Sequence, residues 1–289
     1  MATLRQLRTR VGSISNIQRV TNAMYMVAAA KMRRAQESIE SARPYAERID
    51  TILQRLYSSA DTGEHELFAE RFVQRQATVV VTADRGLCGA FNGNVCRRAL
   101  SELERAQGIE TELITVGRKG RDYLRARGFD GAQHHQDVFR VLQFASAMEI
   151  AQSLTSDFLS GRVDCVQLIY SKFRSVANQV PVTQQLLPIV ASEEAVSDAG
   201  SQAAGNYIFE PEPAQLLGTL VPRHVNFQIW RALLETNAGF FAAQMTAMDN
   251  ATKNAGDLIE ELTREMNKER QSSITLELMD IIGGAEAVA

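Results

Sequence analysis

The chain has 289 residues, enough for two ordinary domains or for one domain with extended helical arms. Its net charge of −3 at pH 7 excludes an overall field that would attract nucleic acid. Cys88, Cys96 and Cys165 form neither a C-x-x-C pair nor a zinc spacing, so they are expected to be reduced thiols. No uncharged apolar stretch approaches the ~20 residues that span a bilayer, so any work at a membrane is expected to depend on docking.

The N-terminal region predicts one long helix. Steps of three and four residues from Leu4 to Leu56 reach sixteen positions, and fourteen of them are apolar or aromatic. This 3.5-residue period is typical of a left-handed coiled coil. Residues 1–36 hold seven basic side chains and no acidic one, a composition also found in mitochondrial presequences. Because the pattern runs unbroken from Leu4 past residue 50, we interpret this region as structural.

The middle of the chain changes period. Short β-branched runs at 77–84, 110–117 and 162–170 alternate with helix-like stretches near 92–107, 118–127 and 143–160. Strands that alternate with helices predict a parallel sheet with right-handed crossovers. The residues after Tyr170 are typical of an antiparallel hairpin that completes this sheet.

The C-terminal region repeats the seam of the first helix. Apolar residues and one threonine recur with the same alternation from Leu234 to Met266, and residues 211–289 carry a net charge of −5. This helix is the natural coiled-coil partner of the first, and the pattern alone allows either orientation. Pro222 is expected to kink or restart it, since proline removes a backbone donor.

Beyond Met266 the seam fails, because Glu269, Ser273 and Asp280 fall in phase. A new apolar cluster follows at Ile274, Leu276, Leu278, Met279, Ile281 and Ile282. The last ~20 residues are therefore expected to extend past their partner helix and meet another surface.

Four segments are predicted, in a fold that combines an α/β domain with a coiled coil. They are an N-terminal coiled-coil helix (1–60), a central Rossmann-like α/β domain (61–190), an exposed linker (191–210) and a C-terminal coiled-coil helix (211–289).

The candidate chemical sites are weak. The loop at 82–94 follows a strand and opens a helix, but it matches neither G-x-x-x-x-G-K-[ST] nor G-x-G-x-x-G. It is interpreted as a tight turn in which Asp84 and Arg85 make local or intersubunit contacts. The four histidines, of which His134 and His135 are adjacent, have no neighbouring nucleophile or apolar pocket. No catalytic, cofactor or metal site is expected.

Lys31, Arg33 and Arg34 form a basic cluster in the stretch that lacks acids. The residues alone leave two readings open, a solvated face or a binding surface for an acidic protein partner.

Three blocks carry a resemblance to a known family. NIQRVTNAMYMVAAAKMRRAQ (16–36), TADRGLCGAFNGNV (82–95) and the stretch 247–287, which contains KERQSSIT, resemble signatures of the γ subunits of F-type ATP synthases. They occur in the order and spacing of that family, so the resemblance covers essentially the whole chain.

The resemblance implies a bacterial-type rotor shaft, with one copy per complex. Its two long helices form an antiparallel coiled coil inside a ring of three α and three β subunits. The central domain lies beside the ε subunit and the membrane c ring. The shaft transmits torque between the two rings, coupling proton translocation to ATP synthesis or hydrolysis, and it has no catalytic site or cofactor of its own. The implied location is peripheral, at the cytoplasmic face of the inner membrane, without nucleic acid.

The resemblance also implies roles for individual residues. Arg270, Gln271 and Thr275 match positions that meet the catch loop of β. Met24 lies where the shaft passes the acidic lever of β, and Lys31, Arg33 and Arg34 lie in the same lever-facing or ε-facing stretch. Ile281 and Ile282 match the apolar tip that is held in the hydrophobic bearing of the α and β collar.

Two positions depart from the family pattern. Gln244 stands where many relatives have arginine, and Gly239-Phe240 stands where a Ser-Glu pair is common. An ion pair at the first position is in doubt, and the added aromatic ring at the second is expected to alter local packing.

Two other classes of function are considered. A nucleotide-dependent enzyme would need a phosphate-binding loop and a base, and the sequence shows neither. A coiled-coil scaffold or nucleic-acid arm would need a free basic face, which the acidic C-terminal helix would neutralise.

Overall fold

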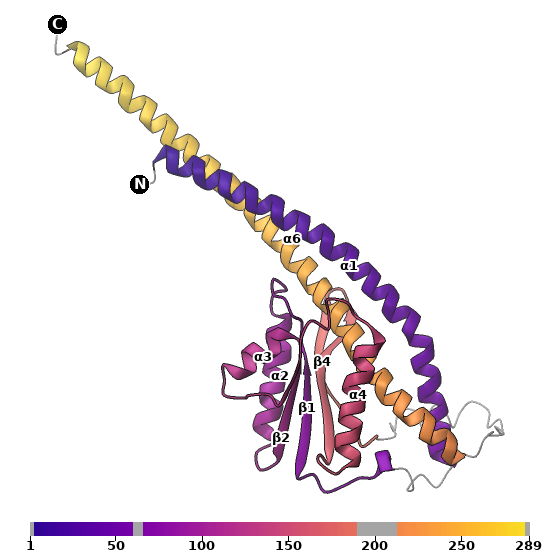
Figure 1. Cartoon of the computed structure of the whole chain (residues 1–289). Coiled ribbons are helices and arrows are strands. Elements are labelled where there is room, and N and C mark those ends of the chain that lie inside the picture. Colours follow the sequence, from indigo (N-terminus) through magenta and orange to yellow (C-terminus); the bar gives the residue numbers. More distant parts are fainter. Residues whose placement is uncertain (1–2, 60–65, 190–212, 287–289) are drawn as a thin grey trace. The chain divides into compact units, whose positions relative to one another are not determined.

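The computed structural model describes residues 3–59, 66–189 and 213–286 (Figure 1). The chain divides into two compact units, which we call the helical unit (residues 1–29 and 244–289) and the sheet unit (residues 30–243). Two long helices, α1 (Leu4–Ser59) and α6 (Pro213–Glu286), contribute to both units. The predicted linker at 191–210 lies outside the described residues, and the division into four segments stays a prediction.

A five-stranded sheet forms the centre of the sheet unit. Its strands are β1 (Arg75–Val81), β2 (Glu110–Val116), β3 (Gln133–His135), β4 (Cys165–Ser175) and β5 (Asn178–Leu187). Their order is β3-β2-β1-β4-β5; the first four run parallel, and β5 pairs antiparallel with β4. This arrangement confirms the Rossmann-like sheet and its closing hairpin. The sequence reading missed the edge strand β3, which has only three residues.

Helices cover both faces of this sheet (Figure 1). Helices α2 (Phe91–Arg105) and α3 (Arg118–Arg125) pack with Val80, Leu113 and Ile169 on one face. On the other face lie α4 (Phe144–Leu159), the short 3-10 helix η2 (Glu66–Phe68) and the sheet-unit parts of α1 and α6. Because side chains alternate along a strand, neighbours such as Val79 and Val80 enter different cores.

The turn after β2 requires glycine. Gly117 has φ +91°, and a Cβ there would lie 1.9 Å from the backbone oxygen of Thr82. The Thr82 hydroxyl accepts a hydrogen bond from the Gly120 amide at 2.8 Å. The carboxyl ends of β1 and β2 therefore approach closely only because residue 117 has no side chain.

The two long helices run antiparallel within each unit. In the helical unit, Thr252 Oγ1 donates to Thr21 Oγ1 at 2.8 Å, and one turn further along α6 a Cβ at Gly256 would lie 3.1 Å from Gln18 Nε2. In the sheet unit, the ring centroids of Tyr45 and Phe227 lie 5.3 Å apart. Lys31 Nζ lies 5.4 Å from the Phe241 ring centroid. Residue numbers fall along α1 as they rise along α6, which settles the orientation left open by the pattern.

The predicted seams are confirmed by burial. Every seam position from Leu4 to Leu53 on α1, and from Leu234 to Met266 on α6, is buried or half-buried. The side chain of Leu56 lies outside the described residues. Helix α6 runs through Pro222 without a break, so it does not restart there, and the alternative of a kink stays a prediction.

Candidate partner-binding surface

The helical unit has a narrow core. Among the residues whose burial is described, its buried apolar ones are Leu7, Ala28, Met248, Ala255 and Leu262, two of which are alanines. Small seam residues allow the helices to approach closely but bury little area, at about 25 cal/mol per Å² of apolar surface. Most of the surface of both helices in this unit therefore remains available to other molecules.

The end of α6 has no cover within the described chain. All residues from Arg270 to Ile282 are exposed, although α6 continues to Glu286. The register set by Thr21 and Thr252 accounts for this, because it places the start of α1 opposite residues near 269. The structure confirms that the C-terminal residues extend past the partner helix.

The second part of this exposed stretch, residues 274–282, is mostly apolar. Six large side chains are between 50% and 68% exposed: Ile274, Leu276, Leu278, Met279, Ile281 and Ile282. At 100° per residue they occupy an arc of about 220°, with Glu277 and Asp280 on the remainder. A surface helix has a narrower apolar stripe than this, and a helix that is apolar around most of its circumference is normally enclosed. We call residues 274–282 the apolar tip.

Of the residues predicted to meet the catch loop of β, Arg270 and Gln271 lie just before the apolar tip, and Thr275 lies within it. Arg270, Gln271 and Thr275 are all exposed. Thr275 Oγ1 donates to the Gln271 backbone oxygen at 2.9 Å, so these two residues occupy adjacent turns of one helix face. The Arg270 guanidinium has no ion pair with any described residue.

A second exposed apolar stripe follows α1 in the helical unit. Ile17, Val20 and Val27 are 55–58% exposed, and with the half-buried Met24 they lie at i, i+3, i+7 and i+10. Of these four residues the sequence analysis named only Met24, and it did so from the family resemblance. The seam that the periodicity followed lies about a third of a turn away. The spacing around Met24 is the signal that would have revealed the other three.

The basic cluster on α1 lies in the sheet unit and does not form a single patch. Lys31, Arg33 and Arg34 are exposed. Lys31 and Arg34 are three residues apart and share a face, whereas Arg33 points about 200° away from Lys31 around the helix axis. Lys31 is also held over the Phe241 ring, so part of its interaction is internal.

The loop at 82–94 is closed by its own contacts. Asn92 Oδ1 accepts the Ala83 amide at 3.0 Å, and Asn92 Nδ2 donates to the Arg85 backbone oxygen at 3.0 Å. Asp84 accepts the Arg118 amide at 3.0 Å, which confirms the predicted local contact. The exposed Leu87 has φ +61° at the loop surface.

The three cysteines of the sheet unit are buried, and the adjacent histidines are half-buried. Cys88, Cys96 and Cys165 are unpaired and buried, and burial raises the pKa of each thiol, to about 12 for Cys96. Burial lowers the pKa of both His134 and His135. Within the described residues no group of three or more His, Cys, Asp or Glu is placed to hold a metal ion. None of the described helices combines the length and apolar character that a bilayer crossing requires.

The family model described as ATP synthase matches residues 3–288. The chain is 46% identical to the ATP synthase gamma chain of Pelotomaculum thermopropionicum and 45% identical to that of an Anaeromyxobacter species, covering all of this chain and all of each relative. Among solved structures, it is similar to a chain from the central stalk and c ring of the Tetrahymena thermophila mitochondrial ATP synthase. That match has a TM-score of 0.63 and 25% identity, covering 80% of this chain and 99% of the other. A chain of the Euglena gracilis mitochondrial ATP synthase shares the fold, with a TM-score of 0.68 and 19% identity over 99% of this chain and 94% of the other.

Proposed function

The chain belongs to the ATP synthase gamma chain family, and we propose that it turns as the central shaft of an F-type ATP synthase without a catalytic site of its own. The observation that carries this proposal is the apolar tip. A helix end that is apolar around more than half of its circumference is stable in water only when a sleeve of other protein surrounds it. A ring of α and β subunits would supply such a sleeve, and a narrow helix can turn within it.

The proposed partners are the α and β subunits, the ε subunit and the membrane c ring. Solved relatives are described as central stalk with c ring, or as F1 with c ring, which supports this set. Torque would pass between the c ring and the sheet unit, and between the helical unit and the α/β ring. Proton flow would thereby bias the three β sites between alternative states. The chain would lie peripherally at the cytoplasmic face of the bacterial inner membrane.

The proposed absence of catalysis rests on the loop at 82–94 and on its surroundings. Asn92 closes the loop through the Ala83 amide and the Arg85 backbone oxygen, and no lysine followed by serine or threonine is available to hold phosphates. The three thiols are buried, and burial raises the pKa of each, which disfavours the thiolate.

Contacts with β and α are proposed at the residues that the structure leaves exposed. Arg270, Gln271 and Thr275 would meet an acidic loop of β, and Ile281 and Ile282 would lie in the α/β collar. Met24 and its apolar stripe would face the β lever. Lys31 and Arg34 on one face of α1, and Arg33 on another, would contact β or ε. Hydrogen bonds to charged groups contribute about 1.5–3 kcal/mol each, so the Arg270 contact would be among the strongest.

Co-expression with the cognate α and β subunits tests this function. The chain is expected to copurify with them without nucleic acid, to change their ATPase rate, and not to hydrolyse ATP alone. Replacing both Arg270 and Gln271 with alanine is expected to weaken assembly or lower turnover without changing the fold. The exposed Glu261→Gln, which precedes the end of the seam, is the matched control and should change neither.

Two results would contradict the proposal. Micromolar binding of ATP to the isolated chain would restore the enzyme hypothesis. A head complex that excludes the chain would remove the shaft role. If the chain copurified as expected but the double alanine variant of Arg270 and Gln271 assembled and turned over like the parent, the contact assignment would be wrong. The shaft role would still stand.

A further inference from the structure

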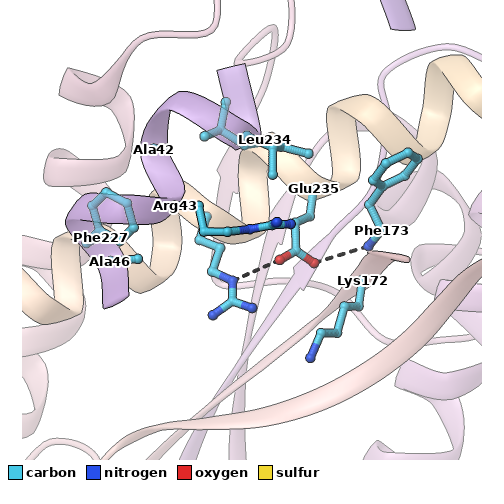
Figure 2. A pocket seen from close by; sticks show the side chains of 10 residues that line it. Ala42, Arg43, Ala46, Lys172, Phe173, Phe227, Leu234 and Glu235 are labelled. Atoms are coloured by element: carbon cyan, nitrogen blue, oxygen red, sulfur yellow. Dashed lines mark hydrogen bonds and ion pairs between the residues drawn. The ribbon is translucent and has the colours of Figure 1, made fainter. Parts of the chain in front are cut away.

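A buried carboxylate joins α6 to the sheet in the sheet unit. Glu235 is 5% exposed and lies at the inner wall of a cavity of about 170 Å³ lined by α1, α6 and β4 (Figure 2). Its Oε2 atom accepts the backbone N–H of Phe173 on β4 at 3.1 Å. Its Oε1 atom accepts Arg231 Nε at 2.8 Å, one turn earlier on α6.

The strand is irregular where Glu235 binds it. The pairing of β4 with β5 shifts register between Phe173 and Ser175, where the two-stranded hairpin nears its turn. The Glu235 carboxylate of α6 therefore accepts a main-chain N–H of β4 at the place where the hydrogen-bond ladder between β4 and β5 is irregular. The contact fastens the helix to the backbone of the sheet, whereas a contact between two side chains could adjust by changing rotamers.

Elsewhere α6 meets the sheet through a side-chain hydrogen bond, from Gln184 Nε2 on β5 to Gln228 Oε1 at 3.1 Å, and through apolar contacts, so Glu235 is distinguished by binding main chain. Val221, Val225, Ile229 and Leu233 of α6 join the main apolar core. Apolar contacts are non-directional, so they resist separation of the helix more than its rotation about its own axis. A hydrogen bond from a fixed backbone amide to a carboxylate oxygen is directional, so it adds resistance to such rotation.

We infer that Glu235 is a torque-bearing positioning residue, which fixes α6 to β4 and stops the helix from turning against the sheet. The inference rests on the proposed shaft function, in which torque must pass from the sheet unit into α6. Arg231 holds the Glu235 carboxylate in place, and the hydrogen bond to the Phe173 amide transmits force between β4 and α6.

The test uses the whole complex, reconstituted in vesicles with its cognate subunits, and measures protons pumped per ATP hydrolysed. E235A removes the acceptor and is expected to lower this ratio at least twofold. E235Q keeps an amide oxygen that accepts the Phe173 N–H, and it is expected to keep the parent ratio. A purely structural role would change stability and leave the ratio constant.

Asp164 provides a matched control. It is also buried, it accepts the amides of Gln74 and Arg75 at 3.1 and 2.9 Å, and it pairs with the Arg75 guanidinium. These contacts do not involve α6. D164A is expected to lower the thermal stability of the complex while the pumping ratio stays at the parent value.

The outcomes separate the two claims. If the parent complex hydrolyses ATP and pumps no protons, the proposed function fails. If the parent pumps and E235A has the parent ratio, or if D164A lowers the ratio equally, the inference about Glu235 fails. Should E235A not assemble, E235D decides, because its side chain is one methylene shorter and is expected to lower the ratio. A parent ratio for E235D would then overturn the inference.

Discussion

The sheet unit buries most of its apolar residues in closed cores, with exceptions such as Phe72, whereas the helical unit leaves a continuous stretch of its own exposed. One core cluster of the sheet unit includes Phe158, Leu168 and Ile229, each no more than 1% exposed. In the helical unit, exposed positions run without interruption from Arg270 to Ile282. The first pattern is that of a domain that folds alone, and the second is that of a surface completed by another protein. The comparison teaches that one continuous helix, α6, changes from core element to binding element along its length.

The comparison predicts very different costs for apolar truncation in the two units. Phe158→Ala in the sheet unit is expected to lower the free energy of unfolding by about 3–5 kcal/mol, because it leaves a cavity in a closed core. Ile282→Ala, at a side chain 59% exposed, is expected to change it by less than about 0.5 kcal/mol. Urea denaturation of the isolated chain measures both. Equal losses would show that the apolar tip is already packed within the chain.

A smaller effect is expected at Gly239, where this chain departs from the common Ser-Glu pair. A Cβ at Gly239 would lie 2.9 Å from Phe91 Cε2, and the Phe91 ring is itself only 5% exposed. Gly239→Ala would improve helix propensity by about 1 kcal/mol, but the clash is expected to cost about 1–3 kcal/mol, so the net change is destabilising.

The Phe91→Leu background sharpens this prediction, because it removes the aromatic edge that meets residue 239. In that background Gly239→Ala is expected to stabilise the sheet unit. The four chains of this double-mutant cycle can be compared by thermal unfolding. An unchanged sign in both backgrounds would mean that the contact with Phe91 does not explain the glycine. The packing of Phe240 against Phe91, with centroids 6.3 Å apart, belongs to the same cluster.

In the helical unit the expected effects are smaller still. Thr252 Oγ1 bonds to Thr21 Oγ1 at 2.8 Å and also to the Met248 backbone oxygen at 2.8 Å. The coupling between Thr21→Val and Thr252→Val is expected to be about 0.5–1.5 kcal/mol, which is the net value of one hydrogen bond. Hydrogen exchange of the seam amides in all four chains gives the coupling energy. Strict additivity would show that this bond does not hold the two helices in register.

Acidification is expected to act gradually, and on the sheet unit alone. Burial lowers the pKa of His134 and His135, and their Nε2 atoms are buried without a hydrogen-bond partner among the described residues. A histidine whose folded-state pKa is depressed stabilises the fold above its ordinary pKa of 6.5, and that stability is lost as the pH falls below it. The melting temperature is therefore expected to decline from pH 7.5 to pH 5.5.

Replacing both histidines with glutamine is expected to flatten this decline. Thermal unfolding across the pH range measures it, with the seam amides of the helical unit as an internal reference. A slope that is unaffected by the double replacement would assign the pH dependence to other groups.

The sequence predicted what depends on period and composition. The two seams, the α/β alternation and the exposed apolar tip all follow from residue spacing, which helix and strand geometry translate directly into position. β3 was missed because three residues do not establish a period. The continuity of α6 through Pro222 was missed because tertiary packing of Val221 and Val225 outweighs the lost donor.

The spacing of apolar residues does not predict which residues far apart in the sequence are in contact. Nothing in the spacing places Phe91 against Gly239, or Glu235 on the amide of Phe173. Such pairs depend on how helices pack on a sheet, which one sequence does not encode locally. The residue roles on the binding surface came from resemblance to a family, and they stay predictions until a partner is bound.

Observation of rotation tests the central claim most directly. An exposed cysteine introduced at Glu104 on α2 would carry a bead, since the native thiols are buried and burial raises the pKa of each. With the head immobilised through β, the account predicts that ATP drives the bead in one direction, with three pauses in each turn. A head that hydrolyses ATP at its normal rate while the bead stays still would contradict it.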